Sequence, residues 1–106
     1  MDKITASHIL IMHNESKDSR SDLSKNEAKK LINDLHKKLG KKKSLFKDLA
    51  QKHSDCSSSN YGGSLGEFGK GVMVKPFEES AFSLKVGEIS NPIETDFGFH
   101  IIKRDE

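Results

Sequence analysis

The feature of this sequence that most restricts its fold is a run of β-branched and other apolar residues near the N-terminus. Ile4 to Met12 reads Ile-Thr-Ala-Ser-His-Ile-Leu-Ile-Met and is apolar at both odd and even positions. A strand with two apolar faces suits the middle of a sheet. A second strand pattern, Phe99 to Arg104, lies at the other end of the chain. We therefore predict an α+β domain in which these two strands pair at the sheet centre, with helices around them.

Three helices are predicted between these strands. The first begins at Ser24, which is followed three residues later by Glu27 at capping-box spacing, and is expected to end at Gly40. The second is expected from about residue 44 to residue 53, and the third from Pro76 to Gly87. Apolar residues recur at helical spacing in the first helix: Ala28, Leu31, Ile32, Leu35 and Leu39.

The turn-rich segments supply two shorter strands. Residues 54–71 hold five of the eight glycines. Such a segment forms turns, close backbone approaches and, near Leu65, a short strand. Ile89 to Thr95 is a further strand candidate, which Pro92 restricts to a short or edge strand.

Length and composition indicate one small domain over residues 1–106. Hydrophobic residues make up 33% of the chain, enough for one modest core. No apolar run has the length of a signal peptide or a membrane span. The single cysteine, Cys56, cannot form an internal disulfide. We therefore expect a soluble, cytoplasmic monomer without a membrane partner.

Basic residues are concentrated in the first half of the chain. Five of them nearly form a run: Lys37, Lys38, Lys41, Lys42 and Lys43. The formal net charge is nevertheless only +2, and the chain has no Trp and one Tyr. Cations suit the C-terminal end of a helix, and no nucleic-acid recognition motif accompanies the run. We interpret it as a solvated helix end and expect no nucleic-acid partner.

Four polar residues are candidates for catalysis, with His13 a weaker fifth: His8, Cys56, Thr95 and His100. His8 lies in the first predicted strand and His100 in the last, so their imidazoles can meet if these strands are neighbours. Taken alone, each histidine fits a structural role better than a catalytic one. A lone cysteine is likewise most often an inert small apolar residue.

Two other chemistries use the same residue types. A Cys–His pair would suggest a thiol hydrolase, but no oxyanion hole or local signature accompanies Cys56. Zinc would need a set such as His8, His13, Cys56 and His100, whose spacing matches no zinc pattern. We expect no metal and no cofactor.

Several large apolar residues lie in or beside the glycine-rich turns: Leu65, Phe68, Met73, Phe77 and Phe97. Either the core or the wall of a pocket would account for them, since pocket walls commonly come from loops.

Six ordered motifs resemble the parvulin family of peptidyl-prolyl cis/trans isomerases. In chain order they are Ser-His-Ile-Leu-Ile around His8, the loop Ser54 to Ser58, the glycine-rich turn made of Gly62 to Gly66 and Phe68 to Gly71, and the segments Val72 to Glu79, Val86 to Ser90 and Thr95 to Lys103. The resemblance extends over about residues 4–104. It implies a four-stranded antiparallel sheet surrounded by about four helices.

The resemblance also implies an activity, which is rotation about X–Pro bonds of peptides and proteins without a cofactor. By matching positions, the proline ring would be held by an apolar set with Phe97 beside it: Leu65, Phe68, Met73 and Phe77. Cys56 would face the rotating amide, with His8, His100 and Thr95 as a hydrogen-bonded group beneath. No bond breaks in this reaction, so we expect a non-covalent mechanism.

Phosphate selectivity is the point on which the motifs are mixed. One branch of the family prefers phospho-Ser/Thr before proline and has a basic residue and two adjacent arginines near the first strand. The corresponding positions here are Met12 and Lys17-Asp18, with Arg20 close by. Lys17 and Arg20 would make only a weak anion site, because phosphate prefers bidentate arginines.

Other positions point in both directions. Phe97 and Val74 replace a small hydroxyl residue and a polar side chain of the phospho-selective branch, whereas Cys56 and the serines after it resemble that branch. We expect an isomerase without strict phosphate dependence. The alternatives are a phospho-Ser/Thr-Pro-directed isomerase and a proline-peptide-binding or chaperone module with weak turnover.

Overall fold

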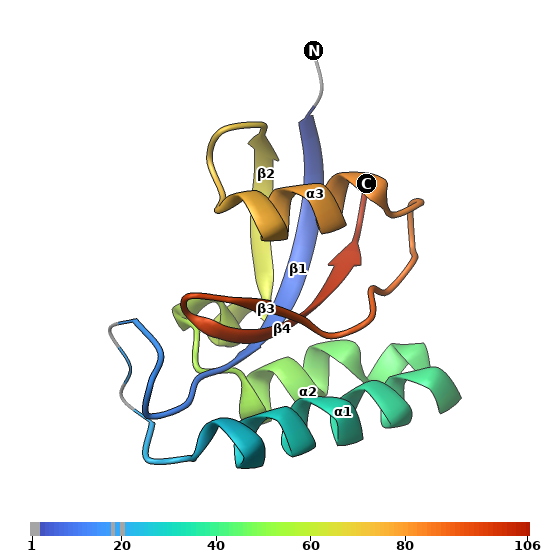
Figure 1. Cartoon of the computed structure of the whole chain (residues 1–106). Helices are drawn as coiled ribbons and strands as arrows, with labels where there is room; N and C mark the ends of the chain where they lie inside the picture. Colours follow the sequence, from blue (N-terminus) through green and yellow to red (C-terminus); the bar gives the residue numbers. More distant parts are fainter. Residues whose placement is uncertain (1–2, 18, 20) are drawn as a thin grey trace.

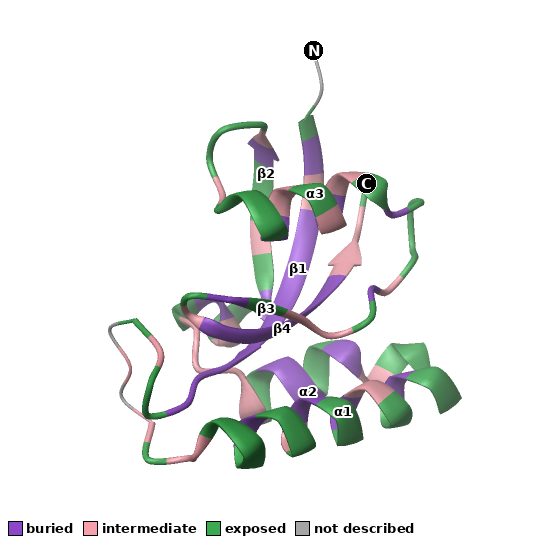
Figure 2. Cartoon of the chain, in the orientation of Figure 1, coloured by how far each residue is buried: buried purple, intermediate pink, exposed green. Residues whose placement is uncertain are grey.

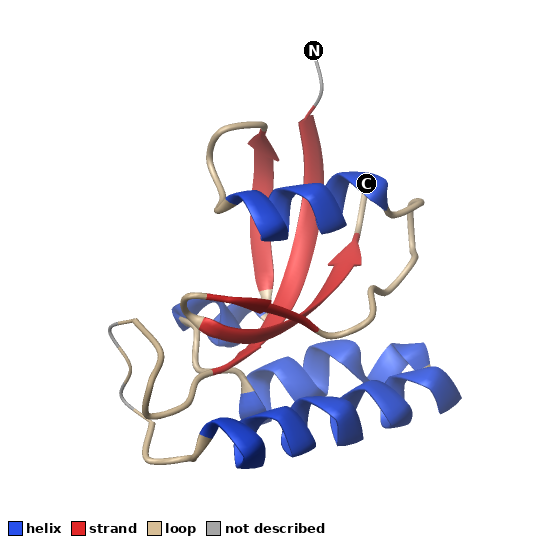
Figure 3. Cartoon of the chain, viewed as in Figure 1, coloured by secondary structure: helices blue, strands red, loops and turns tan. Residues whose placement is uncertain are grey.

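The computed structural model describes residues 3–17, 19 and 21–106. Its elements, shown in Figure 3, follow in chain order: β1 (Lys3–Ile11), α1 (Lys25–Lys41), a 3-10 helix (Lys43–Leu45), α2 (Phe46–His53), a second 3-10 helix (Ser57–Tyr61), β2 (Ser64–Gly69), α3 (Lys75–Ser83), β3 (Ile93–Thr95) and β4 (Gly98–Arg104). The strands form one antiparallel sheet in the order β2-β1-β4-β3. The predicted α+β architecture, with the two outermost strands of the sequence at the sheet centre, is confirmed.

The resemblance implies about four helices around the sheet. Among the described residues there are three α-helices and two short 3-10 helices. The second 3-10 helix begins directly after Cys56, in a segment of serines and glycines that favours tight turns over a longer helix. No described helix is long and apolar enough to cross a membrane.

The pairing of β1 with β4 decides which side chains share a face of the sheet. His8 lies opposite Ile102 and Leu10 lies opposite His100. Side chains alternate between faces along a strand, so all four of these point to the same side. His8 and His100 are therefore diagonal neighbours across the two central strands, a separation that ring side chains can bridge.

The opposite face of the sheet carries the larger hydrophobic core. Ile9 and Ile11 of β1 and Phe99 and Ile101 of β4 pack against the apolar stripes of α1 and α2. Figure 1 shows these two helices together on one side of the sheet, and Figure 2 shows that their buried residues face it. This core is dense and fully covered, which leaves the other face for a site.

The first face is covered only in part. The α3 helix covers part of this face (Figure 1), and Phe77 and Ala81 of this helix pack with Ile4 of β1 and Ile102 of β4. This smaller core surrounds one end of β1. The stretch of sheet around His8, beside the Phe77 ring of α3, is where the candidate site lies.

Helix boundaries agree with the sequence at the start of α1 and disagree at two ends. The Ser24 hydroxyl accepts a hydrogen bond from the Glu27 amide at 3.1 Å, and the Glu27 carboxylate accepts one from the Ser24 amide at 2.9 Å, as the capping box predicts. Gly40 does not end the helix, because the Lys42 amide still bonds to the Lys38 carbonyl. The third helix ends at Ser83, and Gly87, with φ +84°, forms the turn that follows it.

Two glycines offer a matched test of this packing. Gly98 has φ +132°, and a Cβ added there would collide with the Ile11 carbonyl oxygen. We expect Gly98→Ala to lower the free energy of unfolding by more than about 1 kcal/mol. Gly40 is helical and a Cβ there would meet nothing within 4 Å, so Gly40→Ala should raise stability by about 0.5–1 kcal/mol. Urea denaturation measures both, and equal effects would contradict this account of the β1–β4 approach.

Candidate active site

An open, mostly apolar hollow lies on the part of the sheet that α3 leaves uncovered. Its volume is about 550 Å³. We call it the apolar hollow. The residues that line it are His8 and Leu10 of β1, Met12, Asp55, Cys56, Ser57, Leu65, Val72, Met73, Val74, Phe77, Phe97 and His100. Seven residues selected from the sequence are thus brought together: His8, Cys56, Leu65, Met73, Phe77, Phe97 and His100.

Two other selected residues lie behind the hollow. The ring of Phe68 is buried 6.3 Å from that of Phe77 and packs in the smaller core, so it supports Phe77 and does not line the cavity. Thr95 is buried below His100. Phe68 therefore differs from its expected place in the substrate-binding wall, since its β2 position points it under α3.

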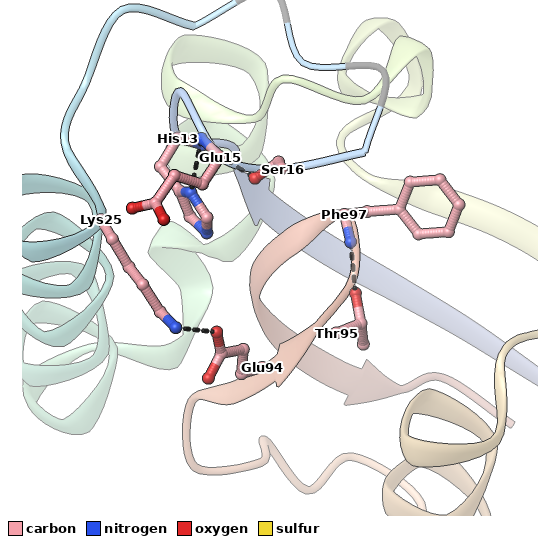
Figure 4. Close-up of polar contacts among 7 residues, drawn as sticks. All are labelled: His13, Glu15, Ser16, Lys25, Glu94, Thr95 and Phe97. Carbon is pink, nitrogen blue, oxygen red and sulfur yellow. Dashed lines mark hydrogen bonds and ion pairs between the residues drawn. The ribbon is translucent and has the colours of Figure 1, made fainter.

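The residues considered for an anion site are divided. The Lys17 ammonium lies over the Phe97 ring, 5.6 Å from its centroid. Asp18 and Arg20 lie outside the described residues. His13 is buried and its Nδ1 accepts a hydrogen bond from the Glu15 amide at 3.1 Å (Figure 4). It lines a separate polar hollow with Lys17 and does not join the histidines of the apolar hollow.

A chain of buried polar side chains forms the floor of the apolar hollow. Thr95 Oγ1 lies 2.7 Å from His100 Nε2, and His100 Nδ1 lies 3.1 Å from His8 Nδ1. Both imidazoles also meet the edge or face of the Phe77 ring at centroid distances of 5.4 Å. The predicted meeting of His8 and His100 is confirmed.

Further contacts hold this chain and set the charge of His100. Thr95 Oγ1 accepts a hydrogen bond from the Phe97 amide at 3.1 Å (Figure 4) and shares one proton with His100 Nε2. Burial, with a smaller contribution from the charge of His8, lowers the pKa of His100 to about 3, so the ring is neutral. A neutral imidazole has one N–H, so His100 donates at one of its two contacts, to Thr95 or to His8, and accepts at the other.

Cys56 completes the chain from the other side. It is the residue before the second 3-10 helix and is partly buried. Interaction with the His8 side chain, followed by the nearby hydroxyl and amide of Ser58, lowers the pKa of the thiol to about 6 against the opposing effect of burial. His8 Nε2 is buried and has no other partner of ordinary hydrogen-bond geometry among the described residues. The site can therefore hold a thiolate at neutral pH.

Backbone groups of β1 hold the cysteine loop in place. Beyond Ser7, β1 no longer pairs with β2, and the loop takes over as its partner. The Leu10 amide donates to the Ser54 hydroxyl at 3.0 Å, and the Met12 amide donates to the Asp55 carboxylate at 2.8 Å. The Asp55 amide donates in return to the Leu10 carbonyl at 2.7 Å. These bonds place the Cys56 side chain beside His8.

Sequence reasoning had missed the roles of several residues. Leu10 of β1 and Met12, directly after it, line the hollow because they follow His8 at intervals of two residues and so share its face. The two-residue period of a strand could have predicted this from the sequence. Ser54 and Asp55 were noted only as part of a motif, and their role as anchors depends on where the loop docks. Val72 and Val74 form the outer wall of the hollow, and no periodic pattern marks them.

Comparison with known proteins decides the family. The family model described as "Rotamase: PPIC-type PPIASE domain" matches residues 8–106. The chain belongs to the parvulin family of peptidyl-prolyl cis-trans isomerases. This parvulin chain is 50% identical over 108 residues to the peptidyl-prolyl cis-trans isomerase pin1 of Schizosaccharomyces pombe, covering 96% of this chain and 62% of that protein.

Two further parvulins extend the comparison. Peptidyl-prolyl cis-trans isomerase Pin1 of Digitalis lanata is 47% identical over 113 residues, which cover 97% of this chain and 96% of that protein. The solved structure of peptidyl-prolyl isomerase ESS1 from Candida albicans matches with a TM-score of 0.95 at 37% identity, over 98% of this chain and 63% of that one. The parvulin fold expected from the motifs is thus confirmed.

The thiol environment gives a direct prediction. Because interaction with His8 is the main cause of the lowered pKa of Cys56, the rate of iodoacetamide alkylation should rise with pH around a midpoint near 6 in the wild-type protein. In His8→Gln the midpoint should move toward the ordinary thiol pKa of about 8.5. His13→Gln, which lies outside the apolar hollow, should leave it unchanged. A wild-type midpoint near 8.5 would contradict this arrangement.

Proposed function

We propose that this isomerase acts by a non-covalent mechanism in which the proline ring enters the apolar hollow. The single observation that carries this proposal is an open apolar cavity whose floor is the Thr95–His100–His8 chain and whose side holds Cys56. Leu65, Met73 and Phe77 give the apolar pyrrolidine ring an apolar surface to pack against. The carbonyl before the proline would then lie near the thiol.

The physical basis is selective binding of the twisted amide. Rotation about a peptide bond is opposed by a barrier of about 18–20 kcal/mol, because it breaks amide resonance. The twisted amide has less negative charge on its oxygen than the planar amide. A thiolate near that oxygen therefore destabilises the planar state more than the twisted one, and the apolar walls provide no hydrogen bond to restore it. An acceleration of about 10⁶ would need about 8 kcal/mol of such differential binding.

The surroundings of the hollow favour an unphosphorylated, apolar residue before the proline. Met12, Val72, Val74 and Phe97 all line the apolar hollow, and Val72 and Val74 are 66% and 40% exposed. The Lys17 ammonium lies over the Phe97 ring, 5.6 Å from its centroid. A phosphate in this place would lose hydration without gaining the paired arginines that suit it. We therefore propose activity without strict phosphate dependence.

The setting proposed for this activity is a cytoplasmic monomer made of one domain over residues 1–106. A thiol that works in its reduced form suits a reducing compartment. The large apolar residues exposed on the described surface are Tyr61, Val72, Val74 and Val86. Val72 and Val74 line the hollow, so few exposed apolar residues remain for contact with a second copy. The proposed partners are flexible proline-containing segments of peptides and proteins, with no cofactor.

A panel of tetrapeptides tests both the activity and the selectivity. Isomerisation of Leu-Pro, Phe-Pro, Glu-Pro and phosphoserine-Pro peptides is followed by exchange NMR or a protease-coupled assay. We expect kcat/KM for Leu-Pro or Phe-Pro to exceed that for phosphoserine-Pro by at least tenfold. A preference for phosphoserine would overturn the proposed selectivity. Binding of every peptide without any acceleration would leave only a binding module.

Substitution of Cys56 separates the electrostatic role from a covalent one. Cys56→Asp keeps a negative charge beside the amide and should retain kcat/KM within about tenfold of the wild type. Cys56→Ala loses the charge and should lose more activity than Cys56→Asp. Mass spectrometry of the wild-type protein with substrate should detect no adduct. Complete inactivity of Cys56→Asp together with a trapped thiol adduct would refute the non-covalent mechanism.

A further inference from the structure

The folded chain has a strongly uneven distribution of charge. Residues 25–53, which contain α1, the first 3-10 helix and α2, hold ten lysines and three acidic residues, a formal charge of +7. The rest of the chain holds eight basic and thirteen acidic residues, a formal charge of −5. The net charge of +2 conceals this division. The sequence alone indicates that the lysine run is a solvated helix end. The structure adds which helices carry these lysines and which face of the molecule they share.

These lysines are exposed, and all but one lack an ion-pair partner among the described residues. All ten are solvent-exposed. Lys25 pairs with Glu94 at 2.8 Å, and no other lysine of residues 25–53 forms an ion pair with a described residue. Lys38 of α1 and Lys52 of α2 both add to burial in lowering the pKa of His53, so charges from the two helices converge on one surface. Nine unneutralised lysines thus share one part of the molecule.

The lysines of α1 include a regular stripe on its outer side. The residues that α1 buries are Ala28, Ile32, Leu35 and Leu39. At 3.6 residues per turn, Lys30, Lys37 and Lys41 lie on the opposite side of the helix, in one row with the acidic residue Asp34. With a rise of 1.5 Å per residue the stripe is about 16 Å long. Over that length a nucleic-acid duplex carries about ten phosphate charges. A rigid row of lysines therefore has enough phosphates to pair with along one duplex.

This surface is separate from the apolar hollow. The α1 and α2 helices pack on Ile9, Ile11, Phe99 and Ile101, whereas the hollow lies on the other face of the sheet with His8 and His100. Figure 1 shows the two helices on the side of the sheet away from α3. A large anion bound to α1 and α2 would leave the hollow open to a proline-containing segment.

We propose that the α1–α2 surface binds the phosphate backbone of double-stranded nucleic acid without sequence specificity. Its positive charges come from lysines, which contact phosphates as point charges and do not read bases as arginine forks do. No exposed large apolar side chain of the described chain lies in residues 25–53, so the surface lacks both a membrane anchor and stacking platforms for single strands. The feature that remains is a charged, rigid surface matched to a backbone.

The experiment uses the full chain and a fluorescein-labelled 20-base-pair duplex in anisotropy titrations at 50 to 200 mM NaCl. Lys30→Gln/Lys37→Gln/Lys41→Gln should weaken binding at least tenfold at 50 mM salt and reduce the slope of log K against log[salt] by about 2 to 3, since each phosphate contact contributes about 0.9. The matched control is Lys3→Gln/Lys75→Gln/Lys85→Gln, which removes the same charge from exposed lysines elsewhere. It should change binding less than threefold.

Isomerase activity on a short Leu-Pro peptide and thermal unfolding should be unchanged in both triple variants, which establishes that they are folded. Equal weakening by the two triple variants would show a net-charge effect and overturn the proposal. Tighter binding to phosphatidylserine vesicles or to a single strand than to the duplex would also overturn the proposal. The absence of any binding to the duplex at 50 mM salt would do the same. None of these outcomes depends on whether the isomerase mechanism proposed above is correct.

Discussion

The antiparallel pairing of β1 with β4 is the interaction on which the rest of the molecule depends. It joins segments more than ninety residues apart and sets His8 opposite Ile102. That register places two imidazoles on one face of the sheet and the residues of the larger core on the other. A shift of one residue would exchange the faces and bury the histidines under α1 and α2. The β1–β4 register therefore also determines whether the residues of the site come together.

The two faces of the sheet have different tasks because they are covered to different degrees. On one face α1 and α2 seal a continuous apolar core. On the other, α3 covers only part of the strands, and the remaining part stays open above a floor of polar side chains. These side chains are tolerated there because Thr95 bonds to His100 and His100 bonds to His8, while His8 also faces the thiol of Cys56. The open face can thus be reactive without destabilising the fold.

How much of this could be predicted from the sequence depended on whether a signal was local. The two-faced apolar pattern of β1 and the capping box at Ser24 are local, and both led to correct predictions. The end of α1 was wrong because a glycine inside a helix resembles one that ends it until the backbone bonds are known. The docking of Ser54 and Asp55 on β1, and the place of Phe68 behind Phe77, depend on contacts between distant segments, which no local pattern records.

The central position of β1 and β4 also has a consequence for how the chain acquires its structure. The central pair of the sheet cannot form until β4, near residue 100, is available to pair with β1. High contact order of this kind slows folding, because a long loop must close before its contacts are gained. During synthesis β1 emerges with both apolar faces uncovered, so it is exposed to aggregation until β4 has been made.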